Sequence, residues 1–231
     1  MITSNVIHRL FRIRYGNGEA TAFTLDVDRR QYLLTAKHAV VGLADRGEVA
    51  LFANGAWIPQ QVRLIGHAPD DRDISVLAME KVMTPPHLVM DATSKGVIYG
   101  QDVFFLGFPY GFLGKYVLTD AGYPLPFVKR ATVSLLDEGI FLLDRHNNPG
   151  FSGGPVVFTE PGRSEFKVFA VISGYRAVDE PIYVDQTPVV AGSGQRLVFR
   201  YNTGIIVTWA IDYALELIQA NPDGVLLPGT A

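Results

Sequence analysis

Short apolar segments separated by turn residues recur along the whole chain, and this pattern constrains the fold more than any other feature. Segments such as "RQYLLTA", "DISVLAM", "DVFFLGF" and "FKVFAVISGY" are rich in β-branched and aromatic residues, and glycine, proline or aspartate stands between them. Runs of this length and composition are typical of strands. A succession of many short strands predicts an all-β fold built as barrels or as a sandwich.

One helix is predicted, near the end of the chain. In "IDYALELIQA" the residues Ile211, Ala214, Leu215 and Ile218 have the spacing of one helical face, and Pro222 follows. We therefore expect a C-terminal helix over residues 210–220.

The chain is long enough for one domain, residues 1–231, made of two β subdomains. A stretch that mixes prolines with polar residues predicts a connector at 86–100, between an N-terminal subdomain (1–85) and a C-terminal one (101–209). Residues 177–195 lack a regular pattern and are expected to form a long surface loop.

Charge and composition exclude several classes of function. The chain has 20 basic and 23 acidic side chains, so its net charge does not favour nucleic acid or an anionic membrane as a partner. Arg9, Arg12 and Arg14 are interpreted as the solvated face of a strand. There is no cysteine, which excludes disulfides, thiolate metal sites and a thiol nucleophile. No secretory signal or membrane-spanning run is evident, so a cytoplasmic location is predicted.

The segment "GFSGGP" indicates an activated serine. Glycines allow backbone conformations denied to other residues and let a ligand approach closely, so the amides of Gly150 and Ser152 are candidates for an oxyanion hole. The alternative is a tight turn in which Ser152 only favours the bend.

A serine nucleophile needs a base and a group that orients the base. His38 follows the apolar segment "YLLTA", and His8, His67, His87 and His146 lack such a setting. The histidines also lack the short spacing of metal ligands, so neither a metal site nor a cofactor is predicted.

Three aspartates compete for the orienting role, namely Asp70, Asp71 and Asp73. Asp73 directly precedes a predicted strand, whereas the other two fall in a predicted turn. Asp73 is therefore the candidate that strand pairing would fix in place.

Together these segments resemble the chymotrypsin-like serine peptidases. "TAKHAVV", "DISVLAM" and "GFSGGPVV" are similar to that family's histidine, aspartate and serine motifs, and they occur in the same order. "TAFTLDVDRRQYLLTAKH", "GVIYGQDVFFLGFPYG" and "VFAVISGYR" resemble bacterial high-temperature-requirement proteases. The resemblance spans residues 17–218 and implies two antiparallel β-barrels followed by the C-terminal helix.

The resemblance also implies roles for single residues. Ser152 would be the nucleophile, His38 the general base and then acid, and Asp73 the group that orients His38. A polypeptide substrate would pair with an edge strand at Ser173, Gly174 and Tyr175. The implied function is that of a serine endopeptidase. The alternatives are a catalytically silent binding module of the same fold and an esterase with the same triad.

Two positions depart from the family pattern. Phe151 replaces an aspartate that binds a new N-terminus in secreted members, so either packing of Phe151 or a substrate or partner would have to order the loop. His146 stands at the floor of the expected specificity pocket and gives no support for cleavage after arginine or lysine. We expect a preference for small or medium apolar side chains, and the alternative is an acidic preference with His146 as the counter-charge.

The chain also ends without the interaction module of the high-temperature-requirement proteases. This ending leaves open a fused domain or a regulatory partner, and the sequence is silent on the oligomeric state.

Overall fold

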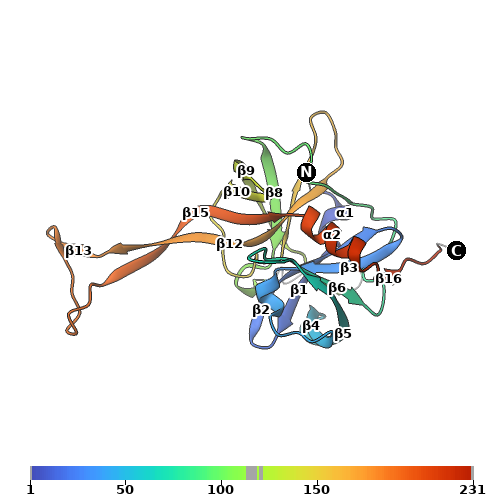
Figure 1. Ribbon diagram of the computed structural model, residues 1–231, viewed down its shortest axis with the longest axis horizontal. Helices are drawn as coiled ribbons and strands as arrows, with labels where there is room; N and C mark the ends of the chain where they lie inside the picture. Colours follow the sequence, from blue (N-terminus) through green and yellow to red (C-terminus); the bar gives the residue numbers. More distant parts are fainter. Residues whose placement is uncertain (1, 113–118, 120–121, 230–231) are drawn as a thin grey trace.

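The computed structural model describes residues 2–112, 119 and 122–229. They form two closed, six-stranded antiparallel β-barrels that pack side by side (Figure 1). The predicted all-β class and the two barrels are therefore confirmed.

The first barrel has the strand order β3-β2-β1-β4-β5-β6, and it closes because β3 also pairs with β6. Its strands are β1 (Leu10–Tyr15), β2 (Gly18–Val27), β3 (Arg30–Thr35), β4 (Arg46–Ala53), β5 (Ala56–His67) and β6 (Ser75–Met79).

The second barrel has the order β11-β8-β9-β10-β15-β12, and it closes because β11 also pairs with β12. Its strands are β8 (Asp102–Gly107), β9 (Phe127–Asp137), β10 (Ile140–Asp144), β11 (Pro155–Phe158), β12 (Lys167–Pro181) and β15 (Val198–Ala210).

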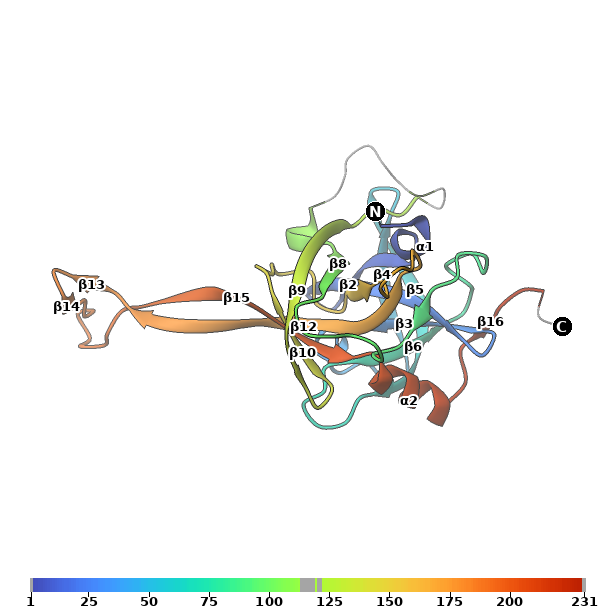
Figure 2. The ribbon, with the colours of Figure 1, turned by 90° about the horizontal axis from the view of Figure 1, so that it is seen from above.

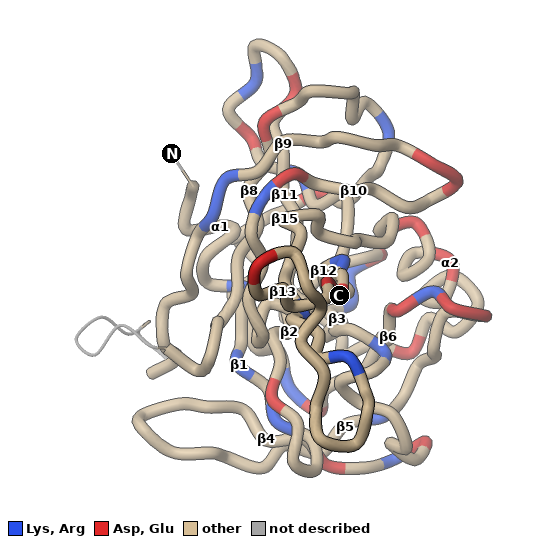
Figure 3. The backbone as a smooth tube through the Cα atoms, turned by 90° about the vertical axis from the view of Figure 1, so that its left-hand side faces the viewer, with Lys and Arg blue, Asp and Glu red and all other residues tan. Residues whose placement is uncertain are grey.

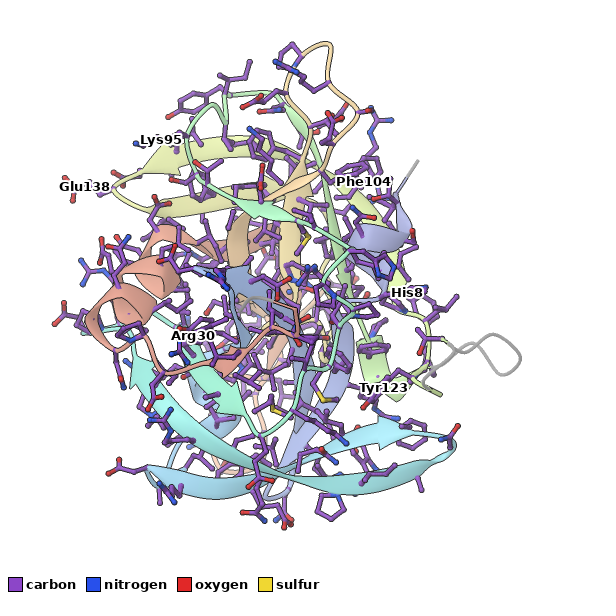
Figure 4. All side chains as sticks on the ribbon, turned by 90° about the vertical axis from the view of Figure 1, so that its right-hand side faces the viewer. His8, Arg30, Lys95, Phe104, Tyr123 and Glu138 are labelled. Carbon is purple, nitrogen blue, oxygen red and sulfur yellow. The ribbon has the colours of Figure 1, made fainter. Side chains whose placement is uncertain are left out.

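Short elements complete the described chain. Strand β7 (Asp91–Ala92) pairs with β12, and β16 (Val225–Leu226) pairs with β3. Beside β16, Arg30 of β3 donates to the carbonyl of Gly224 at 2.7 Å (Figure 4). The remaining elements are the helices α1 (Ser4–Ile7) and α2 (Asp212–Ala220), the 3₁₀ turns η1 (Lys37–Val40) and η2 (Pro109–Gly111), and the strands β13 (Tyr183–Val184) and β14 (Thr187–Pro188).

The predicted C-terminal helix is present as α2. It follows β15 directly and also contacts β5 and β6 of the first barrel. The buried side chains of α2 are Ala214 and Ile218, two of the residues that define the predicted apolar face. None of the helices in the described part of the chain is long and apolar enough to cross a membrane.

Tight turns set the registers of the hairpins. Between β4 and β5, Asn54 and Gly55 both have positive φ (50° and 78°), which is the backbone of a two-residue turn that matches strand twist. Asp28 and Arg29, between β2 and β3, adopt the same left-handed region with φ of 48° and 64°.

Apolar residues of both barrels form one shared core at the junction. One cluster of buried side chains combines Phe23 and Leu34 of the first barrel with Leu106 and Val157 of the second. Because this core joins the barrels, residues at the ends of strands from either barrel are held in a fixed mutual position.

The segment before β1 is helical and not extended. Residues Ser4–Ile7 form a helical turn, in which the amide of His8 donates to the carbonyl of Ser4 at 3.0 Å. Val6 is fully buried in the shared core, which accounts for its apolar character without a strand.

Arg9 does not lie on a solvated face, so that interpretation was wrong for this residue. Its side chain is fully buried, pairs with Asp26 at 2.7 Å and donates to the carbonyls of Leu88 and Thr24. Arg12 and Arg14 instead share the carboxylate of Glu19.

The sequence pattern indicated an irregular loop over residues 177–195, and the structure contradicts this prediction. Beyond the barrel, β12 and β15 continue as a two-stranded hairpin, paired from Ala177↔Asn202 to Pro181↔Val198. The small β13–β14 hairpin forms its tip. We call residues 175–203 the arm, and it projects away from both barrels in two perpendicular views (Figures 1 and 2).

Candidate active site

His38 lies where β3 leaves the first barrel. The strand is buried over most of its length and ends at Thr35, and His38 follows in the 3₁₀ turn η1. The backbone amide of His38 donates to Oδ1 of Asp73 at 2.8 Å, and its Nδ1 lies 2.6 Å from Oδ2 of the same carboxylate. Asp73 therefore fixes both the backbone and the ring of His38.

Among the three competing aspartates, the structure brings only Asp73 to His38. Asp70 has a positive φ of 56° and pairs with Arg72 at 2.8 Å, and Asp71 is exposed. Asp73 stands two residues before β6, and its carboxylate is largely covered, with 13% of the side chain exposed.

The two charged groups shift each other's titration. The hydrogen bond to Asp73 raises the pKa of His38 above its usual value, although burial opposes the change. Burial raises the pKa of Asp73, but the hydrogen bonds from His38 and Ser173 outweigh it, so the pKa of Asp73 is lowered. The geometry therefore favours a carboxylate beside an imidazole whose basicity is increased.

Ser152 is contributed by the second barrel, in the loop before β11. Its hydroxyl donates to the carbonyl of Ser173 at 3.0 Å. The hydroxyl of Ser173 donates in turn to Oδ2 of Asp73 at 2.6 Å. Ser173 thus contacts Ser152 through its carbonyl and Asp73 through its hydroxyl, and Asp73 in turn holds His38.

The glycines beside Ser152 are required by the backbone. Gly150 has φ of +104°, and a Cβ there would lie 2.3 Å from the carbonyl oxygen of Phe108. Gly153 has φ of +80°, and a Cβ there would lie 2.2 Å from the carbonyl oxygen of Thr21. Because neighbouring backbone leaves no space for a side chain, the loop can pass close to both barrels only with glycine at these positions.

Three carbonyl groups of the loop are held by donors outside it. The Pro149 carbonyl accepts from the amide of Tyr110 at 2.8 Å, and the Gly150 carbonyl accepts from the Thr21 hydroxyl at 2.7 Å. The Ser152 carbonyl accepts from the Thr21 amide at 2.8 Å.

Hydrogen bonds to the preceding carbonyl groups orient the two amides that the sequence indicated. The Phe151 carbonyl accepts from the amide of Gly154 at 2.9 Å, which fixes the direction of the Ser152 amide. In a trans peptide the N–H points opposite to the C=O, so the bond from Tyr110 to Pro149 turns the Gly150 amide away from Tyr110. Within the described part of the chain, neither the Gly150 amide nor the Ser152 amide has a hydrogen-bond acceptor.

Phe151 anchors the loop in the core of the second barrel. Its side chain is fully buried, and its ring packs edge-on against Phe105 with centroids 4.9 Å apart. Lys129 lies over the Phe151 ring and donates to the carbonyl of His146 at 2.7 Å and to the side chain of Asn148 at 2.9 Å. Packing of Phe151 and the contacts of Lys129 therefore hold this loop against the second barrel.

The residues predicted to contact substrate occupy two neighbouring segments. Ser173 and Gly174 lie on β12, and Tyr175 stands at the base of the arm with part of its side chain exposed. His146 is exposed, and no described residue hydrogen-bonds to its ring.

Sequence reasoning missed two buried polar residues of the site. Asn147 is buried, and its side chain donates to the carbonyl of Gly174 at 3.2 Å while its own carbonyl accepts from Asn202 at 2.6 Å. Thr21 is also fully buried. A polar residue inside an otherwise apolar strand was the available signal for Thr21, since buried hydroxyls require partners.

Two hollows flank the loop. One has a volume of about 280 Å³ and is lined by residues that include Glu19, Ala20 and His38. The other, of about 140 Å³, is lined by Glu19 and Ala20 together with Gly150 and Tyr110. A hollow of about 450 Å³ lies elsewhere, next to Arg63 and Asp223. It contains none of the predicted site residues, so size alone does not identify the site.

Metal binding has no support in the described part of the chain, where no three metal-ligating side chains gather.

The chain resembles known proteins in its sequence and in its fold. Residues 20–163 match the trypsin-like peptidase domain family. Among curated proteins no relative matches the sequence.

Solved structures with the same fold include three bacterial proteases. The HtrA-type protease AlgW, solved with a tripeptide, has a TM-score of 0.58 and 20% identity, and the match covers 94% of this chain and 61% of that one. The inactive form of the Rv3671c protease of M. tuberculosis has a TM-score of 0.55, 16% identity and coverage of 94% and 91%. The MamO protease domain of Magnetospirillum magneticum has a TM-score of 0.53 and 15% identity, and the match covers 93% of this chain and 98% of that one. At these identities the likeness concerns the fold alone, and this chain spans about three fifths of the AlgW chain.

Proposed function

Because the chain belongs to the trypsin-like peptidase family, we propose that it is a serine endopeptidase that uses Ser152, His38 and Asp73 as its catalytic triad. The single observation that carries this proposal is that Ser173 contacts both Ser152, through its carbonyl, and Asp73, through its hydroxyl, while Asp73 holds His38. These contacts gather a serine, a histidine and a carboxylate at the junction of the barrels, and acyl transfer by serine needs these three groups.

The proposed reaction begins with a rotation of the Ser152 side chain. In the structure its hydroxyl donates to the Ser173 carbonyl, so a change of χ1 is needed to direct it toward Nε2 of His38. An extended substrate supplies the reason for this change, because its backbone N–H would donate to the same carbonyl. Catalytic hydrogen bonds of this kind often form only in the substrate complex.

His38 would then accept the hydroxyl proton as Ser152 attacks the scissile carbonyl, and it would later give that proton to the leaving amine. Asp73 holds Nδ1, so that Nε2 faces the serine, and stabilises the charged imidazole. Water would hydrolyse the acyl intermediate by the same sequence of proton transfers.

The negative oxygen that forms during attack would be bound by the amides of Gly150 and Ser152. Both amides lack other acceptors in the described residues. Their direction is fixed by the bonds that the preceding carbonyl groups accept, at Pro149 from Tyr110 and at Phe151 from Gly154. Fixed donors lower the barrier because they need no reorganisation during the reaction.

The polypeptide substrate would lie along β12, pairing its backbone with Ser173 and Tyr175, while the carbonyl of Gly174 is already engaged by Asn147. Residues after the scissile bond would extend toward the two hollows beside Glu19 and Ala20. No cofactor takes part in the proposed reaction.

A fluorophosphonate probe tests the nucleophile directly. We expect the wild-type protein to be labelled, Ser152→Ala to lose all labelling and His38→Ala to lose most of it. Ser134→Ala, which removes an exposed serine of β9, is the matched control and should label like wild type.

Two other outcomes would contradict the proposal. Absence of labelling in the wild-type protein would favour a silent binding module of this fold. Labelling accompanied by hydrolysis of activated esters, with no cleavage in a diverse peptide library, would favour an esterase. The cleaved peptides of that library would also report the side-chain preference next to the scissile bond.

A further inference from the structure

The arm, residues 175–203, exposes apolar side chains along its whole length. Nine of its large apolar residues are at least 39% exposed, and Phe199 reaches 62%. On one face, Val178 stands opposite Tyr201, and the rings of Phe199 and Tyr201 stack with centroids 6.4 Å apart. The arm itself projects away from the barrels (Figure 2), and none of its residues belongs to a core cluster of the described chain.

A hairpin of this kind is not expected to stand alone in water. An isolated two-stranded hairpin is marginally stable at best, and it normally needs a third strand or a packing surface. The outer part of the arm has neither among the described residues, because its strands pair only with each other. We therefore expect another polypeptide to cover the exposed backbone edges and the apolar face of the arm.

The amount of apolar surface fits a second copy of the arm. By register, Val178 and Phe199 share one face of the arm, and Ile182 and Leu197 continue the same alternation. The exposed parts of these four side chains leave on the order of 400 Å² per chain, about the apolar share of what each partner of a standard protein interface buries. Two arms in contact would thus bury enough area for a specific dimer without help from the barrels.

The charges of the arm agree with self-association. Three basic residues (Arg176, Arg196, Arg200) and three acidic ones (Asp179, Glu180, Asp185) cancel, and Arg200 pairs with Asp179 at 2.7 Å. Seen end-on, the arm shows long uncharged stretches between these residues (Figure 3). Two copies of the arm would therefore not repel each other. A strongly charged partner would gain little electrostatic attraction, because the arm has no net charge of opposite sign.

We propose that the arm is a dimerisation element, through which two copies of this chain associate by a two-fold, arm-to-arm contact that covers the face carrying Val178 and Phe199. A contact of one patch with its own copy closes after two subunits, so a dimer and not a fibre is expected. The proposal does not depend on the proposed peptidase activity.

Sedimentation equilibrium of the full chain tests the proposal. We expect a mass twice that of one chain at micromolar concentration, and at least a tenfold weaker dimer for Phe199→Arg. Arginine at this position faces Glu180 in the hairpin register, so the arm keeps its pairing while its apolar face gains a charge. The matched control is Ile98→Arg, because Ile98 has a similar exposure of 58% outside the arm and should leave the dimer unchanged.

Cysteine cross-linking identifies the surface independently. Since the chain has no cysteine, a single introduced thiol reports one contact. Near a two-fold axis, at least one of Val178→Cys, Val184→Cys and Phe199→Cys should form a disulfide dimer, and Ile98→Cys should not.

Three results would overturn the proposal. A wild-type protein that stays monomeric at about 100 µM, a concentration at which even weak specific interfaces associate, would exclude the dimer. A dimer that withstands Phe199→Arg and gives no cross-link from the arm would lie on another surface. A monomer in which Phe199→Arg weakens binding of a long peptide would assign the arm to substrate.

Discussion

The hydroxyl of Thr21 donates to the carbonyl of Gly150 at 2.7 Å, although Thr21 belongs to the first barrel and Gly150 to the second. The same hydroxyl accepts from the amide of Phe108 at 3.1 Å, and the Thr21 backbone amide holds the carbonyl of Ser152. One buried residue of β2 thus connects three points of the second barrel around the proposed nucleophile, two through its side chain and one through its backbone.

Replacing this residue should separate the effect of its hydroxyl from that of its volume. In Thr21→Val the Gly150 carbonyl and the Phe108 amide lose their partner while the shape is kept. We expect the free energy of unfolding to fall by about 1–3 kcal/mol. We also expect kcat to fall by roughly 10- to 100-fold, because the loop shifts.

Thr21→Ser keeps the hydroxyl and serves as the control. It should recover most of the kcat and of the fluorophosphonate labelling rate. If Thr21→Val and Thr21→Ser have equal rates, the hydroxyl does not position the loop.

The backbone at Gly150 should not tolerate a side chain. Gly150→Ala places a methyl group 2.3 Å from the carbonyl oxygen of Phe108, so the loop has to move and the Gly150 amide loses its direction. We expect kcat to fall by about 10²- to 10³-fold, as for the loss of one oxyanion donor. Kinetics on a peptide substrate measures this change.

Gly162 provides a matched control, because it also has a positive φ (+76°) but has open space around it. Gly162→Ala should cost about 1–2 kcal/mol of backbone strain and leave kcat unchanged. Normal kcat in Gly150→Ala would show that its amide does not bind the oxyanion.

The burial of Phe151 predicts a large effect on stability and a separate one on the site. Phe151→Ala should lower the free energy of unfolding by about 3–5 kcal/mol, because it opens a cavity beside Phe105. Chemical denaturation measures this loss. Phe158→Ala, at another buried phenylalanine of the same cluster, should cost a similar amount.

Activity of the two variants under conditions where both remain folded distinguishes their roles. Only Phe151→Ala should show a reduced labelling rate at Ser152, since only Phe151 lies in the loop. Equal rates in both variants would mean that the anchor stabilises the barrel but not the loop.

The titration of His38 gives a prediction that needs no turnover. Since the carboxylate of Asp73 raises the pKa of His38, Asp73→Asn should lower that pKa. Following the imidazole signals by NMR against pH measures it in both proteins. His67 is an internal control, because burial already lowers the pKa of His67 and it does not contact Asp73. An unchanged His38 titration would exclude Asp73 as its partner.

The pH dependence of catalysis follows from the same shift. The base must be neutral, so kcat/KM should rise as the pH increases through the pKa of His38, which lies above the ordinary imidazole value of 6.5. In Asp73→Asn the rise should move to lower pH while the maximal rate falls by about 10⁴-fold, because the imidazole is no longer held in the required tautomer. A rise at the same pH in both proteins would contradict this assignment.

The fold could be predicted where local chemistry determines it. Turn pairs such as Asn54 and Gly55 specify hairpins by themselves, and the spacing of apolar residues specifies α2. The proposed triad could be suggested because each of His38, Asp73 and Ser152 carries its own local motif.

Features that depend on distant partners could not be predicted. The burial of Arg9 rests on acceptors at Leu88 and Asp26, and the role of Thr21 rests on a carbonyl 129 residues away. Residues 177–195 of the arm were expected to form a loop because prolines and charges interrupt their alternation. The strands of the arm pair with each other and neither face covers a core. The alternation of apolar and polar residues that identifies a barrel strand is therefore missing.

The uninterrupted course of β12 has a practical consequence. A single strand passes from the barrel core through Ser173 and Gly174 into the arm, and beyond Ala177↔Asn202 its pairing is regular. We therefore expect that removing or replacing opposing pairs of arm residues would leave the register of β12 and β15 within the barrel unchanged. The arm is in this sense a detachable module, and the chain is a scaffold on which other hairpins could be grafted.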